Sequence, residues 1–147
     1  MNSKTCFLIG NRNTPHIIKE RLADVVKKHI VEYGVTTYIV GNYGDFDRIV
    51  QGVLREVKER HPNISLYLLA PYALNQKVYT PIGFDGTFYP NGFEKVPFRL
   101  AIVEANRKMI EQSKYLISYC HHIGNTRKIV EYALKREERG LIKVTLL

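Results

Sequence analysis

A short apolar stretch that runs through a glycine turn into a helix start is the feature that most limits how this chain can fold. Residues 5–15 read TCFLIGNRNTP, in which the apolar run Cys6–Ile9 ends at Gly10 and Pro15 opens an amphipathic segment. This pattern predicts a buried strand, a turn and a helix N-terminus. In an open α/β sheet, ligands bind at such turns, and the unpaired N–H groups of a helix start suit phosphate.

The same unit occurs twice more, in the sequences GNYGDFD at Gly41–Asp47 and YCHHIGNT at Tyr119–Thr126. We expect all three turns to converge on one site. The alternative is that these turns only connect strands to helices, because a lone glycine turn is weak evidence of binding. The second turn does not have the glycine spacing of a dinucleotide-binding fingerprint, and no NAD site or other cofactor is predicted.

The order of apolar segments predicts the fold class. Strands are expected at 6–9, 36–40, 64–70, 115–120 and 141–146, and helices at 15–33, 45–60, 96–112 and 125–139. Thr14, Asp45 and either Asn125 or Thr126 are expected to cap three of these helices. Alternating strands and helices predict an α/β protein, a three-layer parallel sheet of about five strands in the approximate order 3-2-1-4-5. No boundary divides the chain, so we expect a single domain over 1–147.

The connection 71–95 is unusually long and irregular, and it is rich in Pro, Gly and aromatic residues. Long connections inside compact domains are often functional. Its aromatic rings are expected either to stack on a base or to cover the sheet edge or a dimer partner. These rings are Tyr72, Tyr79, Phe84, Phe88, Tyr89 and Phe93.

Charge and cysteine content restrict the partners. The formal net charge is +8, which favours anionic partners, but the chain has no block of basic residues typical of nucleic-acid binding. No apolar run is as long as a membrane span, and no secretory signal is recognised, so a cytoplasmic location is expected. Cys6 and Cys120 fall in predicted strands and are expected to be buried free thiols. His121 and His122 lie beside Cys120, but the paired ligand spacing of zinc sites is absent, and no metal is predicted.

Four short motifs in register resemble those of the SLOG superfamily. They are GNR at 10–12, GNYGDFD at 41–47, RLAIVEANRKMIEQSKYLISY at 99–119 and GNTRKIVEYA at 124–133. This Rossmann-like superfamily includes the LOG-type nucleotide phosphoribohydrolases and DNA-processing protein A. The motifs are most similar to those of a bacterial and phage branch of unknown function, which reads GHR, GGAxGFD and RxAIVxRNRxM at the first three positions.

The resemblance implies a Rossmann-like fold that binds a nucleotide or nucleotide-derived ligand over the carboxyl edge of the sheet. Asn11 replaces the usual His and Asn42 replaces a Gly of the family pattern, whereas Arg107 and Lys108 match an RK pair of LOG enzymes. The predicted ligand- or phosphate-binding residues are Gly10, Asn11, Arg12, Gly41, Asn42, Gly44, Phe46, Asp47, Arg107, Gly124, Asn125 and Thr126.

The last turn departs from the catalytic pattern of LOG hydrolases. Those enzymes read PGGxGTxxE with a catalytic glutamate, whereas this chain reads HHIGNT followed by Arg127 and Lys128. No glutamate occupies the expected offset, and Glu131 lies one turn further along. The catalytic candidates therefore remain Glu131, Asp47 and Glu104, with His121 and His122 as possible acids.

Three functions follow from these residues. The first is a module that senses or sequesters a nucleotide-like small molecule, held by backbone N–H groups at Asn11, 42–44 and 125–126 and by Arg12 and Arg107. The second is an N-glycosidase, a phosphoribohydrolase or a ribosyltransferase acting on a nucleotide. The third, ranked last, is nucleic-acid binding. A homo-oligomer is expected because LOG proteins are dimers or larger.

Overall fold

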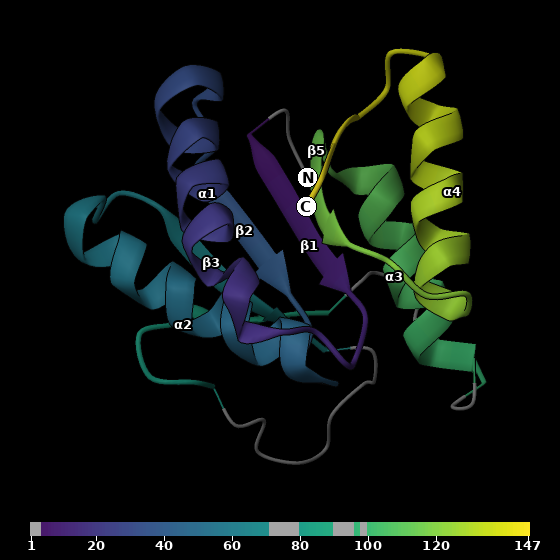
Figure 1. Cartoon of the computed structure of the whole chain (residues 1–147), viewed down its shortest axis with the longest axis horizontal. Helices are drawn as coiled ribbons and strands as arrows, with labels where there is room; N and C mark the ends of the chain where they lie inside the picture. The colour runs from purple at the N-terminus through teal and green to yellow at the C-terminus, as the bar shows by residue number, and fades with distance from the viewer. Residues whose placement is uncertain (1–3, 71–79, 90–95, 98–99) are drawn as a thin grey trace.

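A computed structural model describes residues 4–70, 80–89, 96–97 and 100–147 of the chain. In this part the chain forms one parallel sheet in the order β4-β3-β2-β1-β5-β6 (Figure 1). The strands are β1 Thr5–Gly10, β2 Thr37–Val40, β3 Ser65–Leu69, β4 Gly86–Phe88, β5 Tyr115–Tyr119 and β6 Lys143–Leu146. The helices are the 3-10 turn η1 His16–Ile18, α1 Lys19–Tyr33, α2 Asp45–Arg60, α3 Ala101–Gln112 and α4 Asn125–Glu138.

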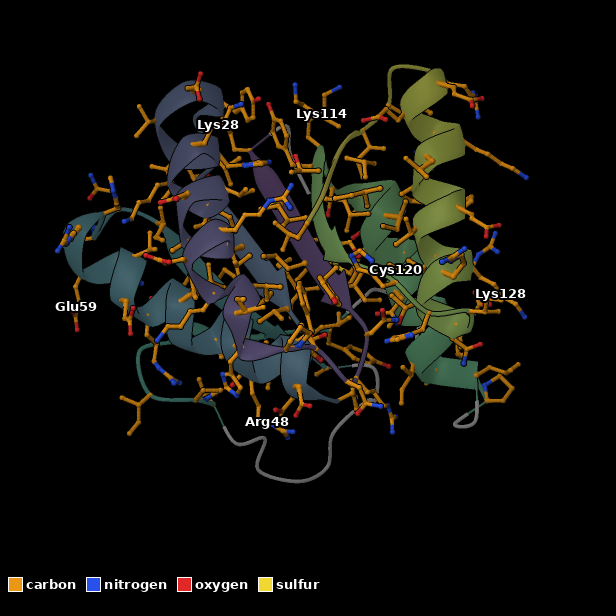
Figure 2. All side chains as sticks on the ribbon, in the orientation of Figure 1. Lys28, Arg48, Glu59, Lys114, Cys120 and Lys128 are labelled. Carbon is orange, nitrogen blue, oxygen red and sulfur yellow. The ribbon has the colours of Figure 1, made fainter. Side chains whose placement is uncertain are left out.

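The helices cover both faces of the sheet. Side chains alternate along β1, so Cys6 and Leu8 pack with α1 and α2 while Phe7 and Ile9 pack with α3 and α4. Both clusters are apolar, as burial of a strand on its two faces requires. The outer sides of the helices carry charges, and Lys128 projects from α4 away from the sheet (Figure 2). The predicted three-layer, Rossmann-like α/β fold is therefore confirmed.

The predicted order of five strands is confirmed for β3-β2-β1-β5-β6, but the expected strand count was one too low. The additional edge strand β4 lies inside the connection 71–95 and pairs with β3 through Tyr67 and Gly86. Asp85 directly precedes β4 and connects it to β3 and α2. Its Oδ2 accepts hydrogen bonds from the N–H of Leu66 at 2.8 Å and from Lys58 Nζ at 2.6 Å. Parts of this connection, including Tyr72, Tyr79 and Phe93, lie outside the described residues.

The three predicted side-chain helix caps are wrong. The Thr14 hydroxyl donates to the carbonyl of Asn11 at 2.6 Å, and a 3-10 turn separates it from α1. Gly44 and Gly124 occupy the cap positions of α2 and α4, and neither helix has a side-chain cap bond. Thr14 thus closes the turn after β1 instead of starting a helix.

Two further expectations are corrected by the element bounds. Helix α3 begins at Ala101, five residues after the predicted start at 96. Cys6 is buried in β1, but Cys120 follows β5 and is half-buried; both are free thiols. Within the described residues, none of the helices combines the length and apolar character needed to cross a membrane.

Strand β1 lies between β2 and β5, and the helices that follow the strands cover a different face of the sheet on each side of β1. The connections through α1 and α2 lie on one face, and α3 and α4 lie on the other (Figure 1). Such a change of direction opens a crevice at the carboxyl ends of the strands. The predicted turns after β1, β2 and β5 meet at this edge.

Candidate functional site

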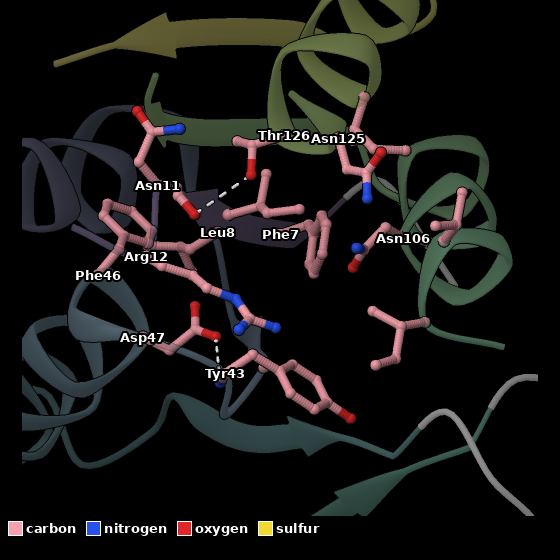
Figure 3. Close-up of a pocket in the computed structure, with 17 residues that line it drawn as sticks. Phe7, Leu8, Asn11, Arg12, Tyr43, Phe46, Asp47, Asn106, Asn125 and Thr126 are labelled. Carbon is pink, nitrogen blue, oxygen red and sulfur yellow. Dashed lines mark hydrogen bonds between the residues drawn. The ribbon is translucent and has the colours of Figure 1, made fainter. Parts of the chain in front are cut away.

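A cavity of about 130 Å³ lies at this switch point, beyond the carboxyl ends of β1 and β2 and against α3 and the start of α4 (Figure 3). One water needs roughly 10–15 Å³ of such space, so the cavity has room for a chemical group of several atoms. Its lining includes the predicted residues Gly10, Asn11, Arg12, Gly41, Gly44, Phe46, Asp47, Asn125 and Thr126. The sequence thus brings residues from all three turns to one place.

The glycines of the first two turns are explained by packing within the protein. A Cβ on Gly10 would lie 2.3 Å from Cγ of Phe46, and a Cβ on Gly44 would lie 2.7 Å from Cα of Arg12. The N–H of Asp45 donates to the carbonyl of Arg12 at 2.8 Å and joins the same two turns. These close approaches fix the wall of the cavity that carries Arg12.

Asp47 is the only carboxylate among the described residues that line the cavity. It is 8% exposed, and its Oδ2 accepts from the N–H of Tyr43 at 2.8 Å. Burial raises the pKa of Asp47 to about 6, although the Tyr43 N–H and the charges of Arg12 and Arg48 favour the ionised form. A carboxyl group with this pKa exchanges its proton close to neutral pH.

Asn11 has a structural role that could not be predicted from the sequence. Its N–H donates to the carbonyl of Tyr119 at 3.0 Å, and its Oδ1 accepts from the N–H of His121 at 2.7 Å. The backbone N–H groups of Asn11 and Tyr43 are therefore engaged inside the protein and do not serve a phosphate as predicted. The first N–H groups of α4, at Asn125 and Thr126, have no acceptor within their own helix, and both residues line the cavity.

The two arginines that were predicted to bind the ligand lie in different places. Arg12 is exposed, and its guanidinium points into the cavity (Figure 3). Among the described residues, no carboxylate lies within ion-pair distance of it. Arg107 is also exposed but does not line the cavity; its guanidinium carbon lies 4.6 Å from the centre of the Tyr132 ring. The structure thus places Arg12, and not Arg107, at the cavity.

Helix α3 contributes residues that the sequence analysis missed. Asn106 and Ile102 line the cavity from α3, one helical turn apart, with Val103 beside them. The amide of Asn106 lies opposite that of Asn125, which comes from α4 (Figure 3). The available signal was the motif itself, because Asn106 directly precedes Arg107 in ANRKM.

The remaining predicted residues lie outside the cavity lining. Glu104 on α3 and Glu131 on α4 are both exposed. Asn42 is exposed and its Oδ1 accepts from Gln51 Nε2 at 3.3 Å, while Gly124 forms the cap of α4. The ring of His121 lies with Nε2 3.0 Å from the carbonyl of Leu147, and His122 is exposed. Of the carboxylates proposed from the sequence, the cavity holds Asp47 alone.

The described residues contain no cluster of three or more His, Cys, Asp or Glu side chains suited to a metal ion. No model of a known protein family and no curated protein matches the chain. The resemblance to the SLOG superfamily therefore stays a prediction from short motifs.

Proposed function

We propose that the protein binds a nucleotide or a nucleotide-derived small molecule in this cavity, as a sensor or sequestering module. The observation that carries the proposal is the position of Arg12 at the switch point, with its guanidinium in the cavity and no described carboxylate paired with it. Ligands of open α/β folds bind at this place, and guanidinium groups are strong partners of phosphate.

The rest of the lining supports the same ligand class. The first N–H groups of α4 and its dipole favour an anion near Asn125 and Thr126. The half-buried apolar side chains of Ile102 and Val103 offer a surface for a base. A net charge of +8 attracts anionic ligands over longer distances.

The test combines thermal unfolding with chromatography on one panel of nucleotides, cyclic nucleotides and ADP-ribose derivatives. A compound at ~100 times its Kd should stabilise the native protein by roughly 2.7 kcal/mol. Stabilisation with the compound recovered intact would support a binding module. An unchanged unfolding temperature with every compound would overturn the proposal.

Two arginine variants locate the site. Arg12→Gln should weaken binding about tenfold or more, because a charge-assisted hydrogen bond to phosphate is lost. Arg107→Gln removes an equal charge from outside the cavity lining and should leave affinity within about twofold. The reverse result would favour the role that the family resemblance gives to Arg107 and would contradict binding at the cavity.

A second candidate is an N-glycosidase, phosphoribohydrolase or ribosyltransferase, and Asp47 is the observation that favours it. Cleavage of a glycosidic bond passes through an oxocarbenium-like state, which a carboxylate stabilises or assists by activating water. Release of free base in the chromatography would support this function. Asp47→Asn should then abolish turnover, whereas Glu104→Gln and Glu131→Gln, outside the cavity lining, should retain it.

Three further expectations from the sequence each have a test. Self-association, implied by the resemblance, would be contradicted by light scattering that shows a monomer at high concentration. Nucleic-acid binding would be contradicted if affinity for oligonucleotides barely fell with added salt. A cytoplasmic location would be tested by fractionating the cells that produce the protein.

A further inference from the structure

The cavity contains groups that attract an anion and one group that repels it. Arg12 and the N-terminus of α4 attract an anion, whereas Asp47 carries the only negative charge of the described lining. A phosphate group beside Asp47 would meet a like charge in a partly buried site, which is unfavourable. Asp47 and the anion-attracting groups therefore suit different chemical groups of one ligand.

The hydrogen bonds of Asp47 leave one oxygen for the ligand. Oδ2 accepts from the N–H of Tyr43, and among the described residues no donor is within hydrogen-bond distance of Oδ1. The side chain is buried and lines the cavity. A buried ionised carboxylate gains from every further donor that it meets, so Oδ1 favours a ligand group with an O–H or N–H.

The position of Asp47 selects among such groups. Asp47 lies close enough to Arg12 for the guanidinium charge to favour ionisation of the carboxyl, so both act on neighbouring parts of a ligand. In a nucleotide, the part next to the phosphate is the sugar. The apolar side chains suited to a base are those of Ile102 and Val103 of α3, which line the same cavity.

We infer that Asp47 accepts a hydrogen bond from a sugar hydroxyl, so that the site selects ribonucleotides over deoxyribonucleotides. This inference rests on the proposed function, because it assigns one part of the same ligand. Asp47 is then a specificity-determining residue in addition to the partner of the Tyr43 N–H.

The experiment compares the four ribonucleoside 5′-monophosphates with their 2′-deoxy and 3′-deoxy counterparts by calorimetry on the wild-type protein. Loss of one hydrogen bond to a charged group should weaken binding by about tenfold to a hundredfold for at least one deoxy series. This comparison needs no variant, so misfolding cannot imitate the result.

Two variants assign the selectivity to its residue. Asp47→Asn keeps an acceptor for the Tyr43 N–H, and it should bring the affinity for ribonucleotides down to that for the deoxy compounds. Asp45→Asn is the matched control, since the same change is made in the same helical turn but outside the cavity lining, and it should keep the selectivity.

The pH dependence gives a second readout. The charges that act on Asp47 are those of Arg12, from the turn after β1, and of Arg48 on its own helix, and the uncharged side chain of Asn106 lines the same cavity from α3. A hydroxyl donates better to the ionised carboxylate, so selectivity for the ribonucleotide should increase as the pH rises through about 6.

The possible results separate the two proposals. Equal affinity for ribo and deoxy compounds would overturn the inference while leaving nucleotide binding intact. Selectivity that persists in Asp47→Asn would remove the assignment to this residue. Failure of every nucleotide in the wider panel to bind would overturn the proposed function, and the inference with it.

Discussion

The two sides of the cavity are built in different ways. The turns after β1 and β2 are packed into each other, with Gly10 against the Phe46 ring and Gly44 against the backbone of Arg12. The turn after β5 is open, because Ile123 is 92% exposed and a Cβ on Gly124 would meet nothing within 4 Å. One side belongs to the core, and the other stands at the surface.

This difference shows that similar glycine turns have different physical causes. Gly10 and Gly44 have ordinary backbone angles and are required by close packing. Gly124 has a φ of 152°, a backbone angle that residues with a side chain rarely adopt. Glycine is therefore required here by the backbone conformation and not by packing. The packed side is expected to hold Arg12 and Asp47 in place, whereas the open side leaves the start of α4 accessible to a ligand.

The largest expected effect tests the packed side. Gly10→Ala places a Cβ 2.3 Å from Cγ of the Phe46 ring, which is 0% exposed and packed in the core. Overpacking of this kind should lower the free energy of unfolding by about 3 kcal/mol, as measured by urea unfolding.

Gly52→Ala is the matched control for this change. Gly52 lies within α2, and nothing lies within 4 Å of its added Cβ. The same substitution should raise the free energy of unfolding by about 0.5–1 kcal/mol, because glycine costs entropy in a helix. Equal losses at Gly10 and Gly52 would show that the packed contact has no special role.

A second prediction concerns the buried carboxyl group of Asp47 on the packed side. The pKa of Asp47 is raised from 3.8 to about 6 on folding, so the unfolded chain loses this proton at lower pH than the native protein does. The contribution to stability is present below the unfolded pKa and is lost as the pH rises through about 6. At pH 8, Asp47→Asn should therefore be more stable than wild type by about 2–3 kcal/mol.

The pH dependence of that difference is the measurement. Urea unfolding of both proteins should show the advantage of Asp47→Asn shrinking between pH 8 and pH 4, while other titrating groups contribute equally to both. An advantage that is independent of pH would contradict burial of an ionised carboxylate as its cause.

A third prediction concerns the link between the two sides. Asn11 joins them, since its Oδ1 accepts from the N–H of His121 at 2.7 Å. Asn11→Ala leaves that donor unpaired and should cost about 1–2 kcal/mol in the free energy of unfolding. Asn125→Ala, at an exposed first position of α4, should change it by less than about 0.5 kcal/mol. Equal effects would show that the link does not contribute.

The same comparison explains what the sequence could predict. The alternation of apolar strands and helices predicted five strands in their observed order, because the strands at the centre of the sheet are buried on both faces. Strand β4 could not be predicted, since Gly86–Phe88 has only three residues and its pairing depends on Asp85 contacting the distant Leu66 and Lys58. Short edge strands are determined by tertiary contacts more than by local pattern.

The site shows the same limit. The meeting of the three turns followed from the parallel sheet, because the carboxyl ends of its strands share one edge. That Asn106 and not Arg107 lines the cavity could not be predicted in this way. Adjacent helical residues differ by about 100° around the axis, and only the packing of α3 decides which one faces the cavity.

The smallest expected effect tests whether the open side is held by Asn11 alone. Thr126 Oγ1 donates to the carbonyl of Gly10 at 3.4 Å, a long contact that should contribute little. Thr126→Val keeps the shape and removes the hydroxyl, so we expect a loss of less than about 0.5 kcal/mol in urea unfolding. A loss as large as that of Asn11→Ala would show that the two sides are joined at two points, and that the open side is less independent of the packed side than its exposure suggests.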